Sequence, residues 1–289
     1  MSPSTSARRI PRPALRASPL TTVLVLVLMA AVPAQAAPRV IVAAGDIASI
    51  DPGDSQTARL VRHLNPDRVL TLGDNAYSSG TPQQFRDYYD PTWGTFRAKT
   101  SPSPGNHDFR TSGASGYFGY FGKRAPAKNY RFVVGNWLLV SLDAWSNRTA
   151  AQTFLRRSLR NDHHRCELVY WHQPRWSSGE HGSQPGIAGI WSLAVRQGVD
   201  VVLNGHDHDY ERFARLNGWG KPSPSGTREF VVGTGGVGLR PFGHAIRGSQ
   251  KRIKSLGVLR MELKANSYAW SFRNVSNTTL DHGTTACHR

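Results

Sequence analysis

Short, mainly apolar runs that alternate with amphipathic stretches are the feature of this sequence that most limits its fold. Five such runs, typical of buried strands, lie at 40–44, 69–72, 138–142, 168–171 and 199–203. Between them, apolar side chains recur at helical spacing, with faces that include Ala58, Val61 and Leu64, then Ala151, Leu155 and Leu159, then Ile187, Ile190, Trp191, Ala194 and Val195. The third of these helices should end at Gly198. This alternation predicts an α/β fold.

The C-terminal part has a different pattern. The segments 230–232, 258–263 and 268–272 follow one another without an intervening helical stretch, and in the last of them large aromatic side chains alternate with smaller or charged ones. This is typical of antiparallel strands. The loops are short, and neither a repeat nor a linker divides the chain, so we expect one domain over residues 37–289.

A basic and then apolar N-terminus predicts export. Four arginines precede an apolar stretch at 20–32, which a small-residue segment, Ala34-Gln35-Ala36, follows. The stretch is short of the roughly 20 residues that span a bilayer, so we expect a cleaved signal peptide at 1–36 and no membrane span after cleavage. The adjacent Arg8 and Arg9 leave both the general and the twin-arginine export routes open. We therefore expect a secreted or otherwise extracytoplasmic protein.

Cys166 and Cys287 are the only cysteines. An oxidising compartment would allow them to pair and to hold the C-terminal tail against the core. Two distant cysteines without a CxxC motif do not make a zinc knuckle by themselves.

Five polar segments carry the chemistry of the sequence. They are Gly45-Asp46, Gly73-Asp74-Asn75-Ala76-Tyr77, Gly105-Asn106-His107-Asp108, Tyr170-Trp171-His172 and Gly205-His206-Asp207-His208-Asp209, and four of them directly follow a predicted buried strand. Each alone is compatible with a turn or a structural histidine. Because ligand sites collect at the carboxyl ends of strands in α/β sheets, the five together predict one metal site. Carboxylates, imidazoles, an amide and a phenol suit two divalent or trivalent ions rather than a thiolate-bound metal.

The order of these motifs resembles that of the calcineurin-like metallophosphoesterases, and more closely their purple acid phosphatase branch, over nearly the whole of residues 37–289. The resemblance is to the pattern GDxG, GDxxY, GNH(D/E), a histidine after a strand, and GHxH. Most of the wider superfamily has a ligand histidine at the position of Ala48, and the purple branch usually has glycine there. Tyr77 stands where that branch has its tyrosinate.

This resemblance implies a fold and a ligand set. The fold is a β-sandwich of two mixed sheets flanked by helices, in αββα layers. The first metal would be held by Asp46, Asp74, Tyr77 and His208, and the second by Asp74, Asn106, His172 and His206, with Asp74 bridging. Fe³⁺ is expected in the Tyr77 site, with Fe²⁺, Zn²⁺ or Mn²⁺ in the second.

The implied reaction is the hydrolysis of phosphomonoesters through in-line attack by a metal-bound hydroxide. His107 would face the phosphoryl group, as a charge stabiliser or as the acid that protonates the leaving oxygen, and Asp108 would orient its ring. His181 resembles a histidine in the corresponding loop of plant relatives, and it is equally compatible with an exposed loop residue.

Two other functions stay open. A phosphodiesterase or nucleotidase would use the same metal core, and the loops at 78–100, 110–128 and 177–189 would decide between these substrates. The excess of 36 Lys and Arg over 19 Asp and Glu also permits a non-catalytic module that binds polyanions. The presence of His107 beside a ligand favours the enzyme. We expect a small phosphorylated substrate and no nucleic-acid partner, and the oligomeric state is left open.

Overall fold

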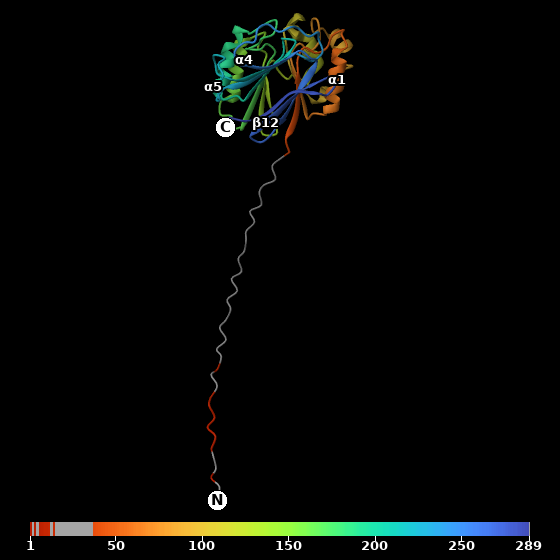
Figure 1. The fold of residues 1–289 in the computed structure, drawn as a ribbon. Coiled ribbons are helices and arrows are strands. Elements are labelled where there is room, and N and C mark those ends of the chain that lie inside the picture. Colours follow the sequence, from red (N-terminus) through yellow and green to blue (C-terminus); the bar gives the residue numbers. More distant parts are fainter. Residues whose placement is uncertain (2, 4–5, 12–13, 15–36, 289) are drawn as a thin grey trace. The chain divides into compact units, whose positions relative to one another are not determined.

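Two mixed β-sheets form the centre of the fold (Figure 1). The first has the order β13-β12-β11-β1-β2-β3. Its strands are β1 (Arg39–Ala44), β2 (Arg68–Leu72), β3 (Thr100–Ser103), β11 (Gly257–Leu263), β12 (Ser267–Asn274) and β13 (Thr279–Ala286). β1, β2 and β3 are parallel, whereas β11, β12 and β13 pair antiparallel. The antiparallel strands predicted at 258–263 and 268–272 are β11 and β12, but the segment 230–232 lies in the second sheet, where it pairs parallel on one side and antiparallel on the other.

The second sheet has the order β10-β8-β9-β7-β6-β5-β4. Its strands are β4 (Tyr130–Val134), β5 (Trp137–Ser141), β6 (Cys166–Tyr170), β7 (Val201–Asn204), β8 (Tyr210–Leu216), β9 (Thr227–Val232) and β10 (Ser249–Ile253). The strands β5, β6, β7 and β9 are parallel, and β4, β8 and β10 pair antiparallel.

The structure, a computed structural model, describes residues 1, 3, 6–11, 14 and 37–288. Residues Ala36–Arg289 form one compact unit. Most of the predicted signal peptide lies outside the described residues, so its cleavage stays a prediction.

Three longer helices, α1 (Gly53–Leu64), α4 (Arg148–Leu159) and α5 (Ala188–Gln197), occupy the predicted positions. Gly198 ends α5 in the left-handed conformation, and its N–H bonds back to the last turn, as expected for a C-terminal cap. The shorter helical segments are α2 (Pro82–Gln84), η1 (Phe85–Tyr89), η2 (Trp93–Lys99), η3 (Asp108–Arg110), η4 (Ser112–Ala114), α3 (Ser115–Phe121), η5 (Gly122–Arg124) and η6 (Pro185–Ile187).

Side chains that alternate along the second sheet divide the core into two clusters. Leu139 of β5 belongs to a cluster that joins both sheets and the buried face of α1. Its neighbours Leu138 and Val140 face the other way and pack with Leu155 of α4 and Trp191 of α5. This alternation produces the αββα layers, with α1 on one side and α4 and α5 on the other (Figure 1).

The sequence pattern missed five strands, and four of them lie at sheet edges. β3 and β13 border the first sheet, and β4 and β10 border the second. Edge strands need no apolar run, since one side of the strand has no sheet neighbour and polar residues are common there. β3 even contains Pro102, which an edge strand accepts because it leaves few ladder bonds to lose.

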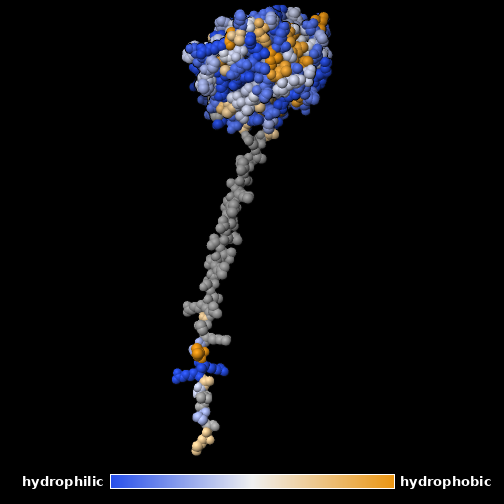
Figure 2. Space-filling model, in the orientation of Figure 1, coloured by the Kyte–Doolittle hydropathy of each residue, from blue (hydrophilic) through white to orange (hydrophobic). Residues whose placement is uncertain are grey.

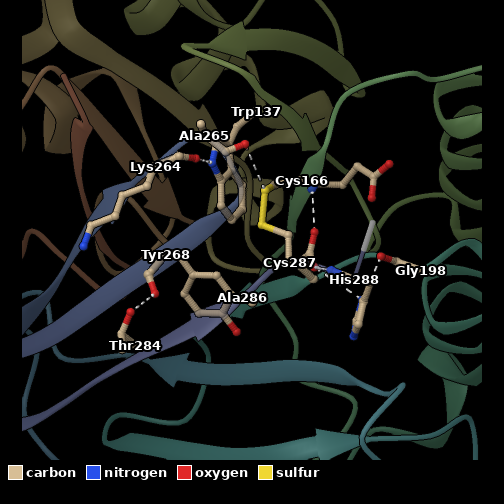
Figure 3. The surroundings of a disulfide bond; sticks show 12 residues. Trp137, Cys166, Gly198, Lys264, Ala265, Tyr268, Thr284, Ala286, Cys287 and His288 are labelled. Atoms are coloured by element: carbon tan, nitrogen blue, oxygen red, sulfur yellow. Dashed lines mark hydrogen bonds and ion pairs between the residues drawn. A yellow bond between two sulfur atoms is a disulfide. The ribbon is translucent and has the colours of Figure 1, made fainter. Parts of the chain in front are cut away.

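A disulfide joins Cys166, at the start of β6, to Cys287, which follows β13 (Figure 3). The N–H of Cys287 also donates to the carbonyl of Asn266, and the N–H of His288 donates to Asp200 Oδ1. The bond therefore ties the last strand of the first sheet to the second sheet.

Among the described residues, no helix is long and apolar enough to cross a membrane. On the face shown in Figure 2, hydrophilic residues cover most of the folded unit, and a smaller area is apolar. Within 37–288, the exposed large apolar side chains are Ile50, Val133, Trp145 and Trp219.

Candidate metal centre

The predicted ligands follow the carboxyl ends of parallel strands from both sheets. Asp46 follows β1, Asp74 follows β2 and Asn106 follows β3, while His172 follows β6 and His206 follows β7. The two sheets meet at this edge, where the N–H of Gly45 donates to the carbonyl of Val232 over 2.9 Å. Strand topology therefore brings residues that are 160 positions apart to one place, as in the 2.8 Å bond from the His206 N–H to Asp46 Oδ2.

Two glycines of the motifs are required by close packing. Gly73 has φ +90°, and a Cβ there would lie 2.5 Å from His172 Nδ1. A Cβ at Gly105 would lie 2.1 Å from Asp74 Oδ1. Any side chain at either position would displace a predicted ligand, which explains why glycine precedes the ligands in these motifs.

The four side chains expected at the first metal converge. The Tyr77 hydroxyl lies 2.8 Å from Asp46 Oδ1, 3.0 Å from Asp74 Oδ2 and 3.2 Å from His208 Nε2. Tyr77 reaches this position because its N–H donates to the carbonyl of Ala48, which pairs with Ala76 in an isolated bridge. The position that carries a ligand histidine in most of the superfamily thus supports the tyrosine through its backbone.

The side chains expected at the second metal lie beside Asp74. His172 Nδ1 is held by the carbonyl of Leu72 at 2.8 Å, and its Nε2 lies 3.2 Å from Asp74 Oδ2 without an aligned hydrogen bond. The ring of His206 is 5.1 Å from that of His172. Asn106 Oδ1 is buried and has no hydrogen-bond partner among the residues that the structure describes. A buried amide oxygen without a partner is costly, and a cation would satisfy it.

The charges of the candidate ligands also favour the binding of cations. Asp46 and Asp74 are almost completely buried, and buried carboxylates need positive partners. Burial opposes a charge on His172, but attraction to Asp74 outweighs it and raises the pKa of His172 to about 9. Burial, and then repulsion from His172, lower the pKa of His206 to about 3, so its lone pair is free for a cation. Asp46, Asp74 and His172 offer ligand atoms that all lie within 4.8 Å of one another.

His107 lies at the edge of this cluster. Its Nδ1 is 2.6 Å from the carbonyl of Ser78, its ring is 4.3 Å from that of Tyr77, and its Nε2 is 3.8 Å from Asp74 Oδ2. Because the carbonyl can only accept, Nδ1 carries the proton, and Nε2 is left on the side of the metal ligands. Burial, only partly opposed by Asp74, lowers the pKa of His107.

Asp108 does not orient the ring of His107, and that prediction is wrong. The Asp108 carboxylate accepts from the N–H of Gly105 at 2.8 Å and from the Nδ2 of Asn75 at 3.0 Å. Burial, with repulsion from Asp74, raises the pKa of Asp108 to about 7. The side chain turns inward because these amides need an acceptor, and it braces the loop of Asn106, while a backbone carbonyl orients His107.

His181 lies beside the centre, in the loop that follows His172 in sequence. Its N–H and its Nδ1 lie 2.7 and 3.1 Å from Asp207 Oδ1, and its ring is 4.4 Å from that of His206. Its side chain is one-third exposed. The structure therefore brings all the predicted site residues together except for the expected contact of Asp108. The roles of Asp207 and Asn75 as supports were not predicted, although both stand inside the ligand motifs.

Comparison with known proteins agrees with this geometry. A family model for the calcineurin-like phosphoesterases matches residues 39–210. The chain is 26% identical over 202 residues to tartrate-resistant acid phosphatase type 5 of Oryctolagus cuniculus, covering 57% of this chain and 62% of that protein. It is 36% identical over 72 residues to purple acid phosphatase 18 of Arabidopsis thaliana, covering 24% of this chain and 16% of that protein. The chain thus spans less than two thirds of either relative.

Solved structures share the fold. Purple acid phosphatase PPD1 from seeds of yellow lupin (Lupinus luteus) superposes with a TM-score of 0.69 at 20% identity, covering 87% of this chain and 54% of that chain. GAP50, described as the anchor in the inner membrane complex of Plasmodium, gives 0.72 at 15% identity, covering 88% of this chain and 90% of that one. These likenesses confirm the predicted fold of two mixed sheets flanked by helices. By its motifs and its match to the family model, the chain belongs to the calcineurin-like phosphoesterase family, and purple acid phosphatases are among its relatives.

Proposed function

We propose that this protein is an exported dinuclear metal-dependent phosphatase that hydrolyses phosphomonoesters. The observation that carries the proposal is the convergence of Asp46, Asp74 and Tyr77 with His172 and His208, beside an Asn106 oxygen that lacks a partner. When bound, two ions would neutralise phosphate oxygens and make hydroxide available near neutral pH. Membership in a phosphoesterase family supports a hydrolase.

The side chains around the centre have distinct parts in this proposal. With Nδ1 donating to the carbonyl of Ser78, His107 stabilises charge on the phosphoryl group, or, in its doubly protonated form, gives the proton on Nε2 to the leaving oxygen. His181, oriented by Asp207, lies on the side of His206 and contacts the phosphoryl group from there.

The metals are part of the proposal. Tyr77 as a phenolate is a hard and strongly donating ligand, which favours Fe³⁺ in the site that it shares with Asp46, Asp74 and His208. Fe²⁺, Zn²⁺ or Mn²⁺ would occupy the site of Asn106, His172 and His206. Burial and the neighbouring carboxylates raise the pKa of Tyr77 well above its usual value, so the phenolate requires a cation.

Export is proposed from the leader at 1–36, and the disulfide supports it, since such bonds persist in oxidising compartments. N-terminal sequencing of protein recovered outside the cytoplasm tests it. A start near Ala37 is expected, and an uncleaved chain would contradict the leader.

Phenyl phosphate, diphenyl phosphate and a nucleotide test the reaction in one assay, with metal analysis of the same preparation. We expect chelator-sensitive hydrolysis of phenyl phosphate, and a loss of both metal and turnover in Asp74→Ala. The exposed Asp87 provides the matched control, Asp87→Ala, which should leave both unchanged. Preference for the diester or the nucleotide would favour those alternatives, and a metal-loaded protein inactive on every ester would favour a binding module.

A further inference from the structure

Two arginines flank the metal centre, and they differ in whether a carboxylate neutralises their charge. Arg240 lies on the side of His208, whose carbonyl accepts from the Arg240 N–H. Its guanidinium is paired with Glu180, with Nη1 and Oε1 2.6 Å apart. Arg110 lies on the side of His107. Among the described residues it has no carboxylate partner, and Nη1 donates to the carbonyl of Ser78 over 3.2 Å.

Arg110 is held directly beside the group that faces the leaving oxygen. The carbonyl of Ser78 that accepts from Arg110 also orients His107, whose Nδ1 lies 2.6 Å from the same oxygen. The neighbouring Thr111 bonds to the next carbonyl, that of Ser79, so the two loops are joined at consecutive residues. Arg110 is exposed, and most of its five N–H donors are left for a ligand.

The charge around the centre is therefore asymmetric. Glu180 neutralises the arginine on the side of His208, while the arginine on the side of His107 stays unneutralised. In hydrolysis, water oxygen bonds to phosphorus, the bond from phosphorus to the leaving oxygen breaks, and that oxygen takes a proton. If His107 supplies this proton, the leaving group lies toward Arg110.

We propose that Arg110 determines specificity by binding an anionic group on the leaving group, so that the preferred substrates are phosphomonoesters whose leaving group itself carries a phosphate or a carboxylate. This inference rests on the proposed phosphatase function. A planar guanidinium suits both anions, because its paired N–H groups match two oxygens. The large positive charge of the chain attracts such substrates in general, and Arg110 provides a defined binding site for their second anionic group.

Three aryl esters with similar leaving oxygens test the inference: phenyl phosphate, 4-carboxyphenyl phosphate and benzene-1,4-diol bisphosphate. The measured quantity is kcat/KM for each charged ester divided by that for phenyl phosphate. Wild-type protein should prefer the charged esters. Arg110→Gln keeps a donor for the carbonyl of Ser78 but lacks the charge, and it should lower the ratio by about 10- to 100-fold, the range for one hydrogen bond to a charged group. The carboxylate and the bisphosphate together show which anion is preferred.

Two further variants separate recognition from support of the loop. Arg110→Lys should recover much of the ratio, since it keeps the cation. Arg196→Gln, an equal loss of charge in the last turn of α5, should leave the ratio unchanged. Equal losses on all three esters in Arg110→Gln would assign Arg110 to loop support and overturn the inference, as would a wild-type protein without preference. A wild-type protein that hydrolyses no ester would instead refute the proposed function.

Discussion

Removal of the disulfide should destabilise the protein strongly and leave its chemistry intact. The bond joins Cys166 to Cys287, which are 121 positions apart, so it closes a long loop in the unfolded chain. The entropy lost by a loop of that length corresponds to about 5 kcal/mol at 25 °C. We therefore expect Cys166→Ala/Cys287→Ala to lower the free energy of unfolding by up to about 5 kcal/mol. For a chain of this size that corresponds to about 10–20 °C in Tm.

Catalysis should survive because the bond and the metal ligands lie at opposite ends of β6. Cys166 begins this strand of 5 residues, and His172 follows its end. The strand spans about 17 Å, well beyond direct contact. At 25 °C the double variant should therefore keep its metal content and its kcat.

Thermal unfolding followed by tryptophan fluorescence measures the first effect, and phenyl phosphate hydrolysis with metal analysis measures the second. Wild-type protein under reductant is the matched control, since it lacks the bond but keeps both sulfur atoms. A fall in Tm of less than about 3 °C in both samples would refute the loop-closure argument. A stable variant that has lost its metal would refute the argument that the disulfide and the metal ligands, at opposite ends of β6, act independently.

Three further predictions concern single side chains. His107→Ala should lower turnover by roughly 100- to 10,000-fold with metal content intact, and less with good leaving groups if it is the acid; equal losses would make it a charge stabiliser. Tyr77→Phe should abolish the visible tyrosinate-to-iron band of protein isolated with iron available, and an active, colourless and iron-free wild type would contradict the iron assignment. Burial of Asp281 opposes its ionisation, but hydrogen bonds from Arg212 and Tyr210 prevail and lower its pKa. The ionised carboxylate therefore stabilises the folded protein above pH about 4, and this stabilisation is lost as the pH falls through the depressed pKa. Asp281→Asn should cost about 3 kcal/mol at pH 7 and less at pH 3.5 in urea unfolding, and a difference that does not change with pH would contradict this account.

The sequence alone predicted most of the parallel strands and a set of candidate ligands. A strand buried on both faces must be apolar along its length, so β1, β2, β5, β6 and β7 were visible as runs. Donors at the ends of such strands must gather at one edge, whatever the loops do. For this reason, the candidate ligands that the family resemblance implied lie close together in the structure.

Tertiary structure decided which strands form the edges of the sheets and how the side chains of His107 and Asp108 are oriented. β3 and β13 are polar, and only their pairing with a neighbour makes them strands. The partner of His107 is the carbonyl of Ser78, which has no signature in the sequence because every residue has a carbonyl. Asp108, adjacent to His107 in the chain, was the obvious partner, but it turns toward the amides of Gly105 and Asn75. The local sequence pattern indicates which side chains are buried. Which polar groups form hydrogen bonds with one another depends on how two loops approach each other in the folded protein.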